Sequence, residues 1–246
     1  MKVALVMQAR MGSSRLPGKI LAPLLEQPIL SVIVRRLGRV AADNAWIATS
    51  REAPDAVTAA WGSALGWRVF RGDEADVLSR FTGIVRACQP DWVVRLTADN
   101  PFVDAGIVEC LVETARRAPA SVALIRSAGA AFPLGYVPEI VRADALLEAE
   151  ARIAPDQGFH RSHVTSWVAE TAGAQPVECP SEWPRQPGWR WTVDTEDDYR
   201  MATAAFGLWR DDWTSIGYPE MVRRLSAHPE IVGLNAHVGQ KDLEES

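Results

Sequence analysis

The sequence contains few cysteines, little excess charge and no long apolar run. Its three cysteines, Cys88, Cys110 and Cys179, are odd in number and widely spaced, which fits neither a disulfide framework nor a zinc site. The formal net charge of −5 argues against general binding to nucleic acid or to a membrane surface, so any anion site must be local. No apolar run is long enough for a signal peptide or a membrane span. These absences predict a cytoplasmic protein.

The two common nucleotide-binding motifs are also missing. A Walker A loop requires G-x-x-x-x-G-K-[ST], whereas here Gly12 and Gly18 are six residues apart and Ile20 follows Lys19. A dinucleotide fingerprint requires G-x-G-x-x-G running directly into a helix, and the loop after the first strand lacks it. If the chain binds a nucleotide, it does so through another kind of loop.

A polar loop of a different kind follows the first apolar run. Residues 3–7 form a short continuous apolar stretch, typical of a strand that is buried on both faces. Beyond it, Gly12 and Ser13 are small enough for backbone N–H groups to face a bound anion. Three cations surround these small residues, namely Arg10, Arg15 and Lys19. We interpret the stretch as a phosphate cradle; the alternative is a surface loop with three solvated charges.

Apolar strands alternate with amphipathic helices through the first half of the chain. This rhythm predicts an α/β fold with a doubly wound, mostly parallel sheet, whose site lies at the carboxyl ends of the strands. From residue 121 the rhythm changes, and residues 121–142 predict a small antiparallel insertion within a single domain over residues 1–246. The later elements that we expect are helices at residues 143–153, 161–171, 197–209 and 218–227, and a last strand at residues 189–193.

Two aspartates follow strands that should end at one edge of the sheet. Asp99 follows the strand at residues 92–96, and Asp194 follows the strand at residues 189–193. A triphosphate carries about four negative charges, so transfer at one of its phosphates normally needs Mg²⁺ held by carboxylate oxygens and waters. We predict that both aspartates hold one Mg²⁺ beside the loop. The alternative is that each caps a helix, one before Pro101 and the other before Glu196.

Three runs together resemble one enzyme family. The loop A-R-M-G-S-S-R-L-P-G-K, the run T-A-D-N-P around Asp99 and the run V-D-T around Asp194 are similar to the signatures of the cytidylyltransferases that activate acidic sugars. That family includes the CMP-3-deoxy-manno-octulosonate and CMP-sialic acid synthetases, and the likeness is greatest to its branch of spore-coat polysaccharide biosynthesis protein F. The resemblance implies a Rossmann-like, GT-A-like nucleotide-diphospho-sugar transferase fold, a loop that holds the nucleoside triphosphate, and Mg²⁺ bound to both aspartates.

The same resemblance assigns further residues to the site. The implied nucleotide-binding residues are Ala9, Arg10, Met11, Gly12, Ser13, Arg15, Lys19, Gly72 and Asp73. Glu139 and His163 stand in runs that line the acceptor half of the cleft in this family, although Ser162 replaces the usual glutamate. An ordinary turn at residues 71–76 and a histidine on the polar face of a helix are the alternatives. By its own chemistry, Arg190 could reach an acceptor carboxylate as a bidentate partner.

The implied reaction is transfer of CMP from CTP to an acidic sugar or a related acceptor, with release of pyrophosphate, in cell-surface polysaccharide or glycoconjugate biosynthesis. The implied catalytic residues are Arg10, Lys19, Asp99 and Asp194. Residues 121–138 resemble the region through which sialic-acid-type relatives pair, so we expect a homodimer; the alternative is a lid over the cleft.

Three other functions stay open at this point. A sugar-1-phosphate uridylyl- or guanylyltransferase would differ only in base and acceptor. A GT-A glycosyltransferase usually binds its metal through a D-x-D pair, and no such pair stands at the fourth strand end. A non-catalytic nucleotide-binding protein would keep the loop but could lose an aspartate, and both aspartates are present.

Overall fold

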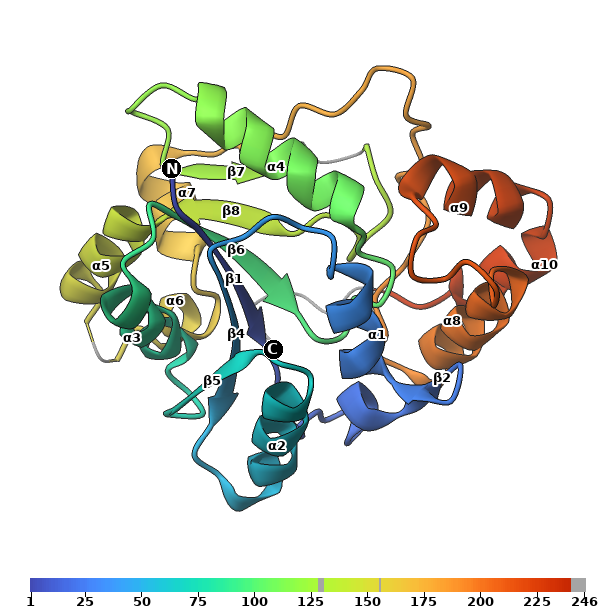
Figure 1. Ribbon diagram of the computed structural model, residues 1–246, viewed down its shortest axis with the longest axis horizontal. Helices are drawn as coiled ribbons and strands as arrows, with labels where there is room; N and C mark the ends of the chain where they lie inside the picture. The colour runs from blue at the N-terminus through green and yellow to red at the C-terminus, as the bar shows by residue number, and fades with distance from the viewer. Residues whose placement is uncertain (128–130, 155, 240–246) are drawn as a thin grey trace.

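The computed structural model describes residues 1–127, 131–154 and 156–239, and this part of the chain folds around one central sheet (Figure 1). Its strands are β1 Val3–Gln8, β4 Asn44–Ser50, β5 Arg68–Gly72, β6 Trp92–Thr97, β7 Leu124–Arg126, β8 Glu139–Arg142 and β9 Gln175–Pro176. They are ordered β5-β4-β1-β6-β8-β7-β9. The first four are parallel neighbours, and β8 is antiparallel to both β6 and β7. The predicted mostly parallel α/β sheet is confirmed.

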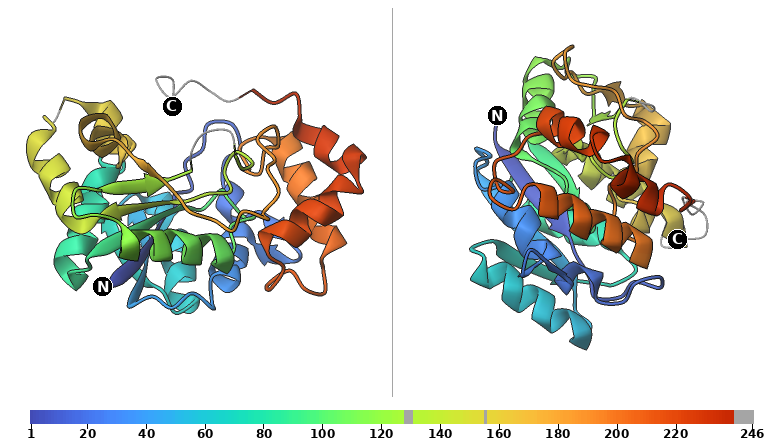
Figure 2. Two further views of the ribbon diagram at one scale, coloured as in Figure 1. Left: turned by 90° about the horizontal axis from the view of Figure 1, so that it is seen from above. Right: turned by 90° about the vertical axis from the view of Figure 1, so that its right-hand side faces the viewer.

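Helices cover both faces of this sheet (Figures 1 and 2). The α-helices are α1 Ile29–Arg36, α2 Ala56–Ala64, α3 Val77–Cys88, α4 Ala105–Arg117, α5 Ala143–Arg152, α6 Gly158–Ser162, α7 Ser166–Ala172, α8 Glu196–Leu208, α9 Tyr218–Ser226 and α10 Pro229–Val232. Short 3₁₀ turns occur at Lys19–Leu21, Ala53–Asp55 and Gly233–Asn235, and β2 Pro23–Leu24 and β3 Gln27–Pro28 form a separate small hairpin. None of the described helices has the length and apolar character needed to cross a membrane.

Strand β1 shows why the sheet is covered on both sides. Leu5 and Met7 pack into a core with residues of α1 and α4, whereas Ala4 and Val6 pack into a second core with residues of α3 and α5. Successive side chains of a strand point to opposite faces, so only a continuous apolar run can fill both cores. The run at residues 3–7 meets that requirement.

The parallel strands deliver their following loops to one edge of the sheet. Gln8 at the end of β1 is in register with Thr97 at the end of β6, and Ala98 N donates to Gln8 O at 3.1 Å. On the other side, Ala9 N donates to Ala48 O at 3.1 Å. The loops after β1 and β6 therefore leave the sheet side by side, which places residues 9–19 next to Asp99.

The strands expected within residues 121–142 are present as β7 and β8, and they are antiparallel as predicted. They extend the main sheet beyond β6, while residues 128–130 lie outside the described part of the chain. Tyr136 is fully buried, and its ring stacks on Tyr218 with centroids 4.6 Å apart. The ring centroid of Phe132 lies 5.2 Å from that of Tyr218. These two aromatic side chains, which belong to the region expected to form a dimer, thus pack against Tyr218 of the same chain.

Two predicted elements are wrong. The helix expected at residues 161–171 is split into α6 and α7, because Val164 has a φ of 51° and a β-branched residue in the left-handed region ends a helix. The strand expected at residues 189–193 is an extended segment that forms only an isolated bridge between Leu134 and Arg190. Its backbone hydrogen bonds go to a turn and a loop instead of a neighbouring strand: Trp191 N donates to Leu134 O, and Val193 N donates to Asp99 O, each at 2.8 Å.

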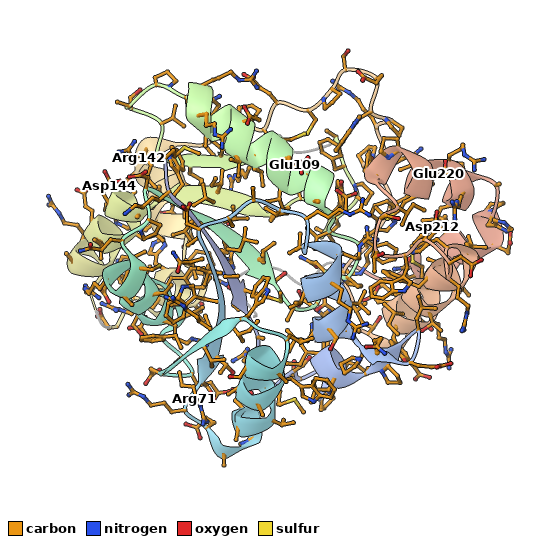
Figure 3. All side chains as sticks on the ribbon, in the orientation of Figure 1. Arg71, Glu109, Arg142, Asp144, Asp212 and Glu220 are labelled. Carbon is orange, nitrogen blue, oxygen red and sulfur yellow. The ribbon has the colours of Figure 1, made fainter. Side chains whose placement is uncertain are left out.

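Helices α8, α9 and α10 gather at one end of the molecule, beyond α1 (Figures 1 and 2). Arg36 of α1 is buried and ties them to the sheet, because Nε donates to Val103 O at 2.9 Å and Nη2 donates to Ile216 O at 3.2 Å. Asp212 and Glu220, both labelled in Figure 3, accept from Arg224 at 2.6 and 2.8 Å. The bonds of Arg36 join the C-terminal helices to α1 and to the loop after β6, and those of Arg224 hold the C-terminal part together.

Candidate active site

The loop after β1 is closed by a hydrogen bond of its own backbone and is held by the side chain of Asp55. Gly18 N donates to Met11 O at 3.1 Å, and Gly18 takes the left-handed φ of 71° that this turn requires. Met11 N donates to the buried carboxylate of Asp55 at 2.6 Å. Within the described residues, the backbone N–H groups of Gly12 and Ser13 donate to no protein acceptor. The loop is therefore shaped by bonds at its ends and leaves its small residues open to an anion.

Lys19 lies between the two aspartates that the sequence singled out. Its Nζ donates to Asp99 Oδ2 at 2.9 Å and to Asp194 Oδ1 at 2.7 Å. The side chain is only 10% exposed, so the alternative of a surface loop with three solvated charges does not hold for this lysine. Its burial could not be seen in the local sequence, because the two carboxylates that enclose the ammonium lie 80 and 175 residues away in the chain.

The extended segment at residues 189–193 brings the two aspartates together. Val193 N donates to Asp99 O, and Leu134 bonds the same segment on its other side, to Trp189 O and from Trp191 N, all at 2.8 Å. The backbone carbonyl of Asp99 thus holds Val193, the residue before Asp194. Residues from the middle and the late part of the chain meet at the end of β6.

The charges of this cluster stabilise one another. Burial alone would raise the pKa of Asp99, but the Lys19 ammonium outweighs it and keeps that pKa below its ordinary value. Burial alone would lower the pKa of Lys19, but the two carboxylates outweigh that effect and keep the pKa above its ordinary value. Arg15 adds a second cation, with Nη2 3.2 Å from Asp194 Oδ2. Asp99 and Lys19 are therefore both ionised at neutral pH.

The helix-cap alternative is wrong for both aspartates. Helix α8 is capped by Thr195, whose side chain accepts from Asp198 N in a reciprocal capping box. Helix α4 is capped by Asp104, whose Oδ1 accepts from Ile107 N at 3.0 Å. Asp99 and Asp194 are therefore not needed to end a helix, and their carboxylates face the loop.

A buried group lies behind Asp194. Arg190 Nη2 donates to Asp194 Oδ2 at 2.8 Å, and Arg190 Nε donates to Asp198 Oδ1 at 2.8 Å. Burial would raise the pKa of Asp198, but hydrogen bonds from Arg190, from Asn235 and from the Asp194 backbone hold it below the ordinary value. The guanidinium that the sequence offered to an acceptor carboxylate is thus engaged by two carboxylates of the chain itself.

Gly72 is the last residue of β5, and Asp73 begins the turn that follows it. Asp73 Oδ1 accepts from Ala75 N at 2.8 Å and Asp76 N at 2.9 Å, which lowers the pKa of Asp73. Glu74 of the same turn comes within 3.7 Å of Arg10. This geometry is the ordinary turn that was the alternative for this segment, and contact of Gly72 and Asp73 with a nucleotide stays a prediction.

A cavity of about 320 Å³ opens where β6 ends, and Thr97 and Asn100, which flank Asp99 in the sequence, line it. Its polar lining comes from Arg95, Thr97, Asn100 and Glu139. Glu139 Oε2 accepts from Arg95 at 2.9 Å and from Thr165 Oγ1 at 2.6 Å, so the turn at residues 163–165 that carries His163 is joined to the wall that carries Glu139.

Sequence reasoning missed Arg95 in this wall. The signal was a charged residue within the otherwise apolar strand W-V-V-R-L. Burying a charge in a strand is costly unless it is paired, so such a residue in a central strand indicates a partner and often a site.

Asp99 and Asp194 supply a donor set that suits a divalent cation with oxygen ligands. Both carboxylates already converge on one positive charge, the Lys19 ammonium. Mg²⁺ typically binds through one or two carboxylates and completes its shell with waters and substrate phosphates. Among the described residues, no group of three or more His, Cys, Asp and Glu could hold a metal by itself. The residues fit a cation that shares its coordination with a nucleotide, and they do not fit a closed structural metal site.

Comparison with known proteins identifies the family. The family model described as cytidylyltransferase matches residues 4–176. Spore coat polysaccharide biosynthesis protein SpsF of Bacillus subtilis is 33% identical over 236 residues, which cover 93% of this chain and 95% of that protein. A 3-deoxy-manno-octulosonate cytidylyltransferase of Escherichia coli is 31% identical over 121 residues, 48% of each chain.

Solved structures share the fold. A cytidylyltransferase of Leptospira borgpetersenii superposes with a TM-score of 0.86 at 26% identity, covering 94% of this chain and 97% of that one. CMP-2-keto-3-deoxy-manno-octonic acid synthetase in complex with CTP has a TM-score of 0.63 at 17% identity, covering 84% and 99%. A Mycobacterium tuberculosis protein in complex with manganese has a TM-score of 0.56 at 17% identity, covering 83% and 99%. The chain belongs to the cytidylyltransferase family, and it is a nucleotidyltransferase of that family rather than a glycosyltransferase or a binding module.

Proposed function

We propose that the protein transfers CMP from CTP to an acidic sugar or a related acceptor in a Mg²⁺-dependent reaction that releases pyrophosphate. The observation that carries the proposal is the convergence of Asp99 and Asp194 beside the loop of residues 9–19. The named relatives support the choice of CTP and of polysaccharide synthesis as the setting, because one is a spore-coat polysaccharide protein and another was solved with CTP.

The loop binds the triphosphate in this proposal. Backbone N–H groups of Gly12 and Ser13 have no acceptor within the described residues and are free to meet phosphate oxygens. Arg10 is half exposed and Arg15 one-third exposed, so both guanidinium groups can reach a bound anion. Each charge-assisted contact contributes about 1.5–3 kcal/mol.

The two aspartates and Lys19 serve the reacting phosphate. Asp99 and Asp194 would hold Mg²⁺, which supplies charge stabilisation on phosphoryl oxygens when it is bound. Lys19, together with Arg10, would stabilise the charge that develops on the departing pyrophosphate. Preorganised charges of this kind act in the transition state, so they affect turnover more than ground-state binding.

The cavity at the end of β6 is the proposed acceptor site. Its wall presents the guanidinium of Arg95 and the carboxylate of Glu139, with Thr97 and Asn100 nearby as neutral donors and acceptors. These groups suit a ligand that carries hydroxyls and a carboxylate. His163 stays a proposed contributor through the turn that joins Glu139.

The test is release of pyrophosphate from a panel of CTP, UTP, GTP and ATP with a set of 2-keto sugar acids, each with Mg²⁺, with Mn²⁺ and with EDTA. The proposal expects release only with a divalent cation, with CTP as the preferred nucleotide and with an acidic acceptor. Preference for UTP or GTP with a sugar 1-phosphate would overturn the choice of base and acceptor. Release that is unaffected by EDTA would overturn the metal.

We also propose that the enzyme acts in the cytoplasm as a homodimer. The few, unpaired cysteines suit a reducing compartment. Because Tyr136 is fully buried within the chain, a dimer would have to use other residues of this region. Light scattering at micromolar concentration decides the oligomeric state, since a 27.0 kDa particle would be the monomer.

A further inference from the structure

We propose that Asn235, in the last turn of the described chain, positions Asp194 for catalysis through Asp198 and Arg190. The C-terminal segment would then be part of the active site, although the family match ends at residue 176. This inference rests on the proposed function, in which Asp194 is a metal ligand.

The first link runs from Asn235 to the segment before Asp194. Asn235 is 2% exposed, and its Nδ2 donates to Arg190 O at 3.0 Å and to Asp198 Oδ1 at 2.9 Å. Both amide protons are therefore used, one on the backbone and one on the buried carboxylate. One side chain from the 3₁₀ turn at Gly233–Asn235 thus binds α8 and the extended segment at once.

The second link is the carboxylate of Asp198, whose side chain is fully buried. Besides Asn235, it accepts from Arg190 Nε at 2.8 Å and Nη2 at 3.2 Å, and its Oδ2 accepts from Asp194 N and Thr195 N at 3.0 Å each. A buried carboxylate with this many donors is held in one orientation. It therefore fixes both the guanidinium of Arg190 and the backbone of Asp194.

The third link concerns the two carboxylate oxygens of Asp194, which have different partners. Arg190 Nη2 holds Oδ2 at 2.8 Å, while Oδ1 points to the Lys19 ammonium that it shares with Asp99. One oxygen is anchored and the other is presented to the place where the two carboxylates converge. Arg190 is in this view a positioning residue for Asp194, which explains why its donors point inward.

The effect of a residue on the orientation of a metal ligand can be distinguished from its effect on the stability of the fold. Loss of such an outer partner typically costs 10–100-fold in metal affinity or activity. A residue that only stabilises the fold would lower the melting temperature and leave metal affinity and turnover of the folded protein unchanged. Metal affinity and turnover therefore report the positioning role, and the melting temperature reports the structural role.

The experiment compares Asn235→Leu with Val222→Ala in the full-length chain. Val222 is buried in α9 and has no hydrogen bond to the group behind Asp194, so its truncation is a matched loss of C-terminal packing. Direct Mn²⁺ binding by electron paramagnetic resonance, in the presence of CTP without acceptor, and kcat with saturating CTP are measured for both. We expect Asn235→Leu to weaken Mn²⁺ binding and lower kcat, each by about 10-fold or more, with KM for CTP little changed. Val222→Ala should change neither.

Two further variants keep the outcomes distinct. If Asn235→Leu does not fold, Asn235→Ser, which keeps one donor, should show the same two losses to a smaller degree. In an Asp194→Asn background, Asn235→Leu should cause no further loss of kcat, because both changes act through one carboxylate. Full activity of Asp194→Asn would refute the proposed function. Loss of activity in Asp194→Asn together with unchanged Mn²⁺ affinity and kcat in the Asn235 variants would refute only the positioning role.

Discussion

Replacing Lys19 by methionine should make the protein less stable on its own and more responsive to a divalent cation. In the structure the ammonium lies 2.9 Å from Asp99 and 2.7 Å from Asp194, so it occupies the point where the carboxylates converge. A lysine and a metal ion cannot both hold the same two oxygens at that point. In the absence of nucleotide, Lys19 should therefore compete with the cation.

The magnitude follows from the burial of the group. Removing one partner of a buried ion pair costs about 3–5 kcal/mol, and the low end applies here because the Asp99 and Asp194 side chains keep 27% and 19% exposure. A loss of about 3 kcal/mol in a chain of this size lowers the melting temperature by roughly 6–12 °C. A cation at a hundred times its dissociation constant would return about 2.7 kcal/mol, which is most of that loss.

The assay is thermal unfolding of wild type and Lys19→Met in a MnCl₂ series without nucleotide. Lys19→Met should start lower and gain several degrees with Mn²⁺, whereas wild type should gain less at every concentration. Lys2→Met, directly before β1 and remote from the two aspartates, is the control and should behave as wild type.

Two results would refute the reasoning. An unchanged melting temperature of Lys19→Met in the absence of metal would show that the ammonium does not stabilise the two carboxylates. A Mn²⁺ response no larger than that of wild type would show that the cation does not bind where Lys19 lies.

Three further predictions concern the same cluster. Asp99→Asn or Asp194→Asn should lower the rate of pyrophosphate release by about 100-fold, and the double variant should be little worse, because both residues act through one ion. Arg15→Ala should weaken CTP binding by about 1.5–3 kcal/mol in calorimetry without unfolding the protein, and unchanged affinity would count against the phosphate cradle. The free energy of unfolding of wild type should fall as pH drops from about 3.8 through the lowered pKa of Asp99, since the unfolded chain binds that proton first; urea titrations should show a shallower fall in Lys19→Met.

Much of the fold followed from local pattern, because its strands are continuous apolar runs and its helices are amphipathic. Residues 3–7 show this best: five apolar side chains in a row predict a strand covered on both faces, and all five are buried. The loop was readable for the same reason, since small residues between cations at a strand end have few other uses. The errors at Val164 and at residues 189–193 came from tertiary contacts that overrode a local preference.

The site was only partly readable. Asp99 and Asp194 could be named because each follows an apolar run, but the burial of Lys19 depends on partners at sequence distances of 80 and 175 residues, which no local pattern records. The capping box of Thr195 and Asp198 was visible as T-x-x-D, and it would have removed the cap alternative for Asp194. Asn235 carried no signal at all, since a single asparagine near the end of a chain is typical of any surface.

The order of these residues along the chain connects folding with activity. The loop follows β1 and Asp99 follows β6, and both strands lie in the first half of the chain. Asp194, in contrast, is held by Arg190, Asp198 and Asn235 from the last quarter of the chain. The sheet without the C-terminal helices would keep the cations of the loop and one carboxylate, and it would lack the second. Under the proposed function, nucleotide binding should therefore depend chiefly on the first part of the fold, and turnover should depend on the 3₁₀ turn that carries Asn235. A variant that removes the hydrogen bonds of Asn235 or Asp198 behind Asp194 should thus lose kcat before it loses affinity for CTP, because the phosphate contacts and the carboxylate pair come from different parts of the chain.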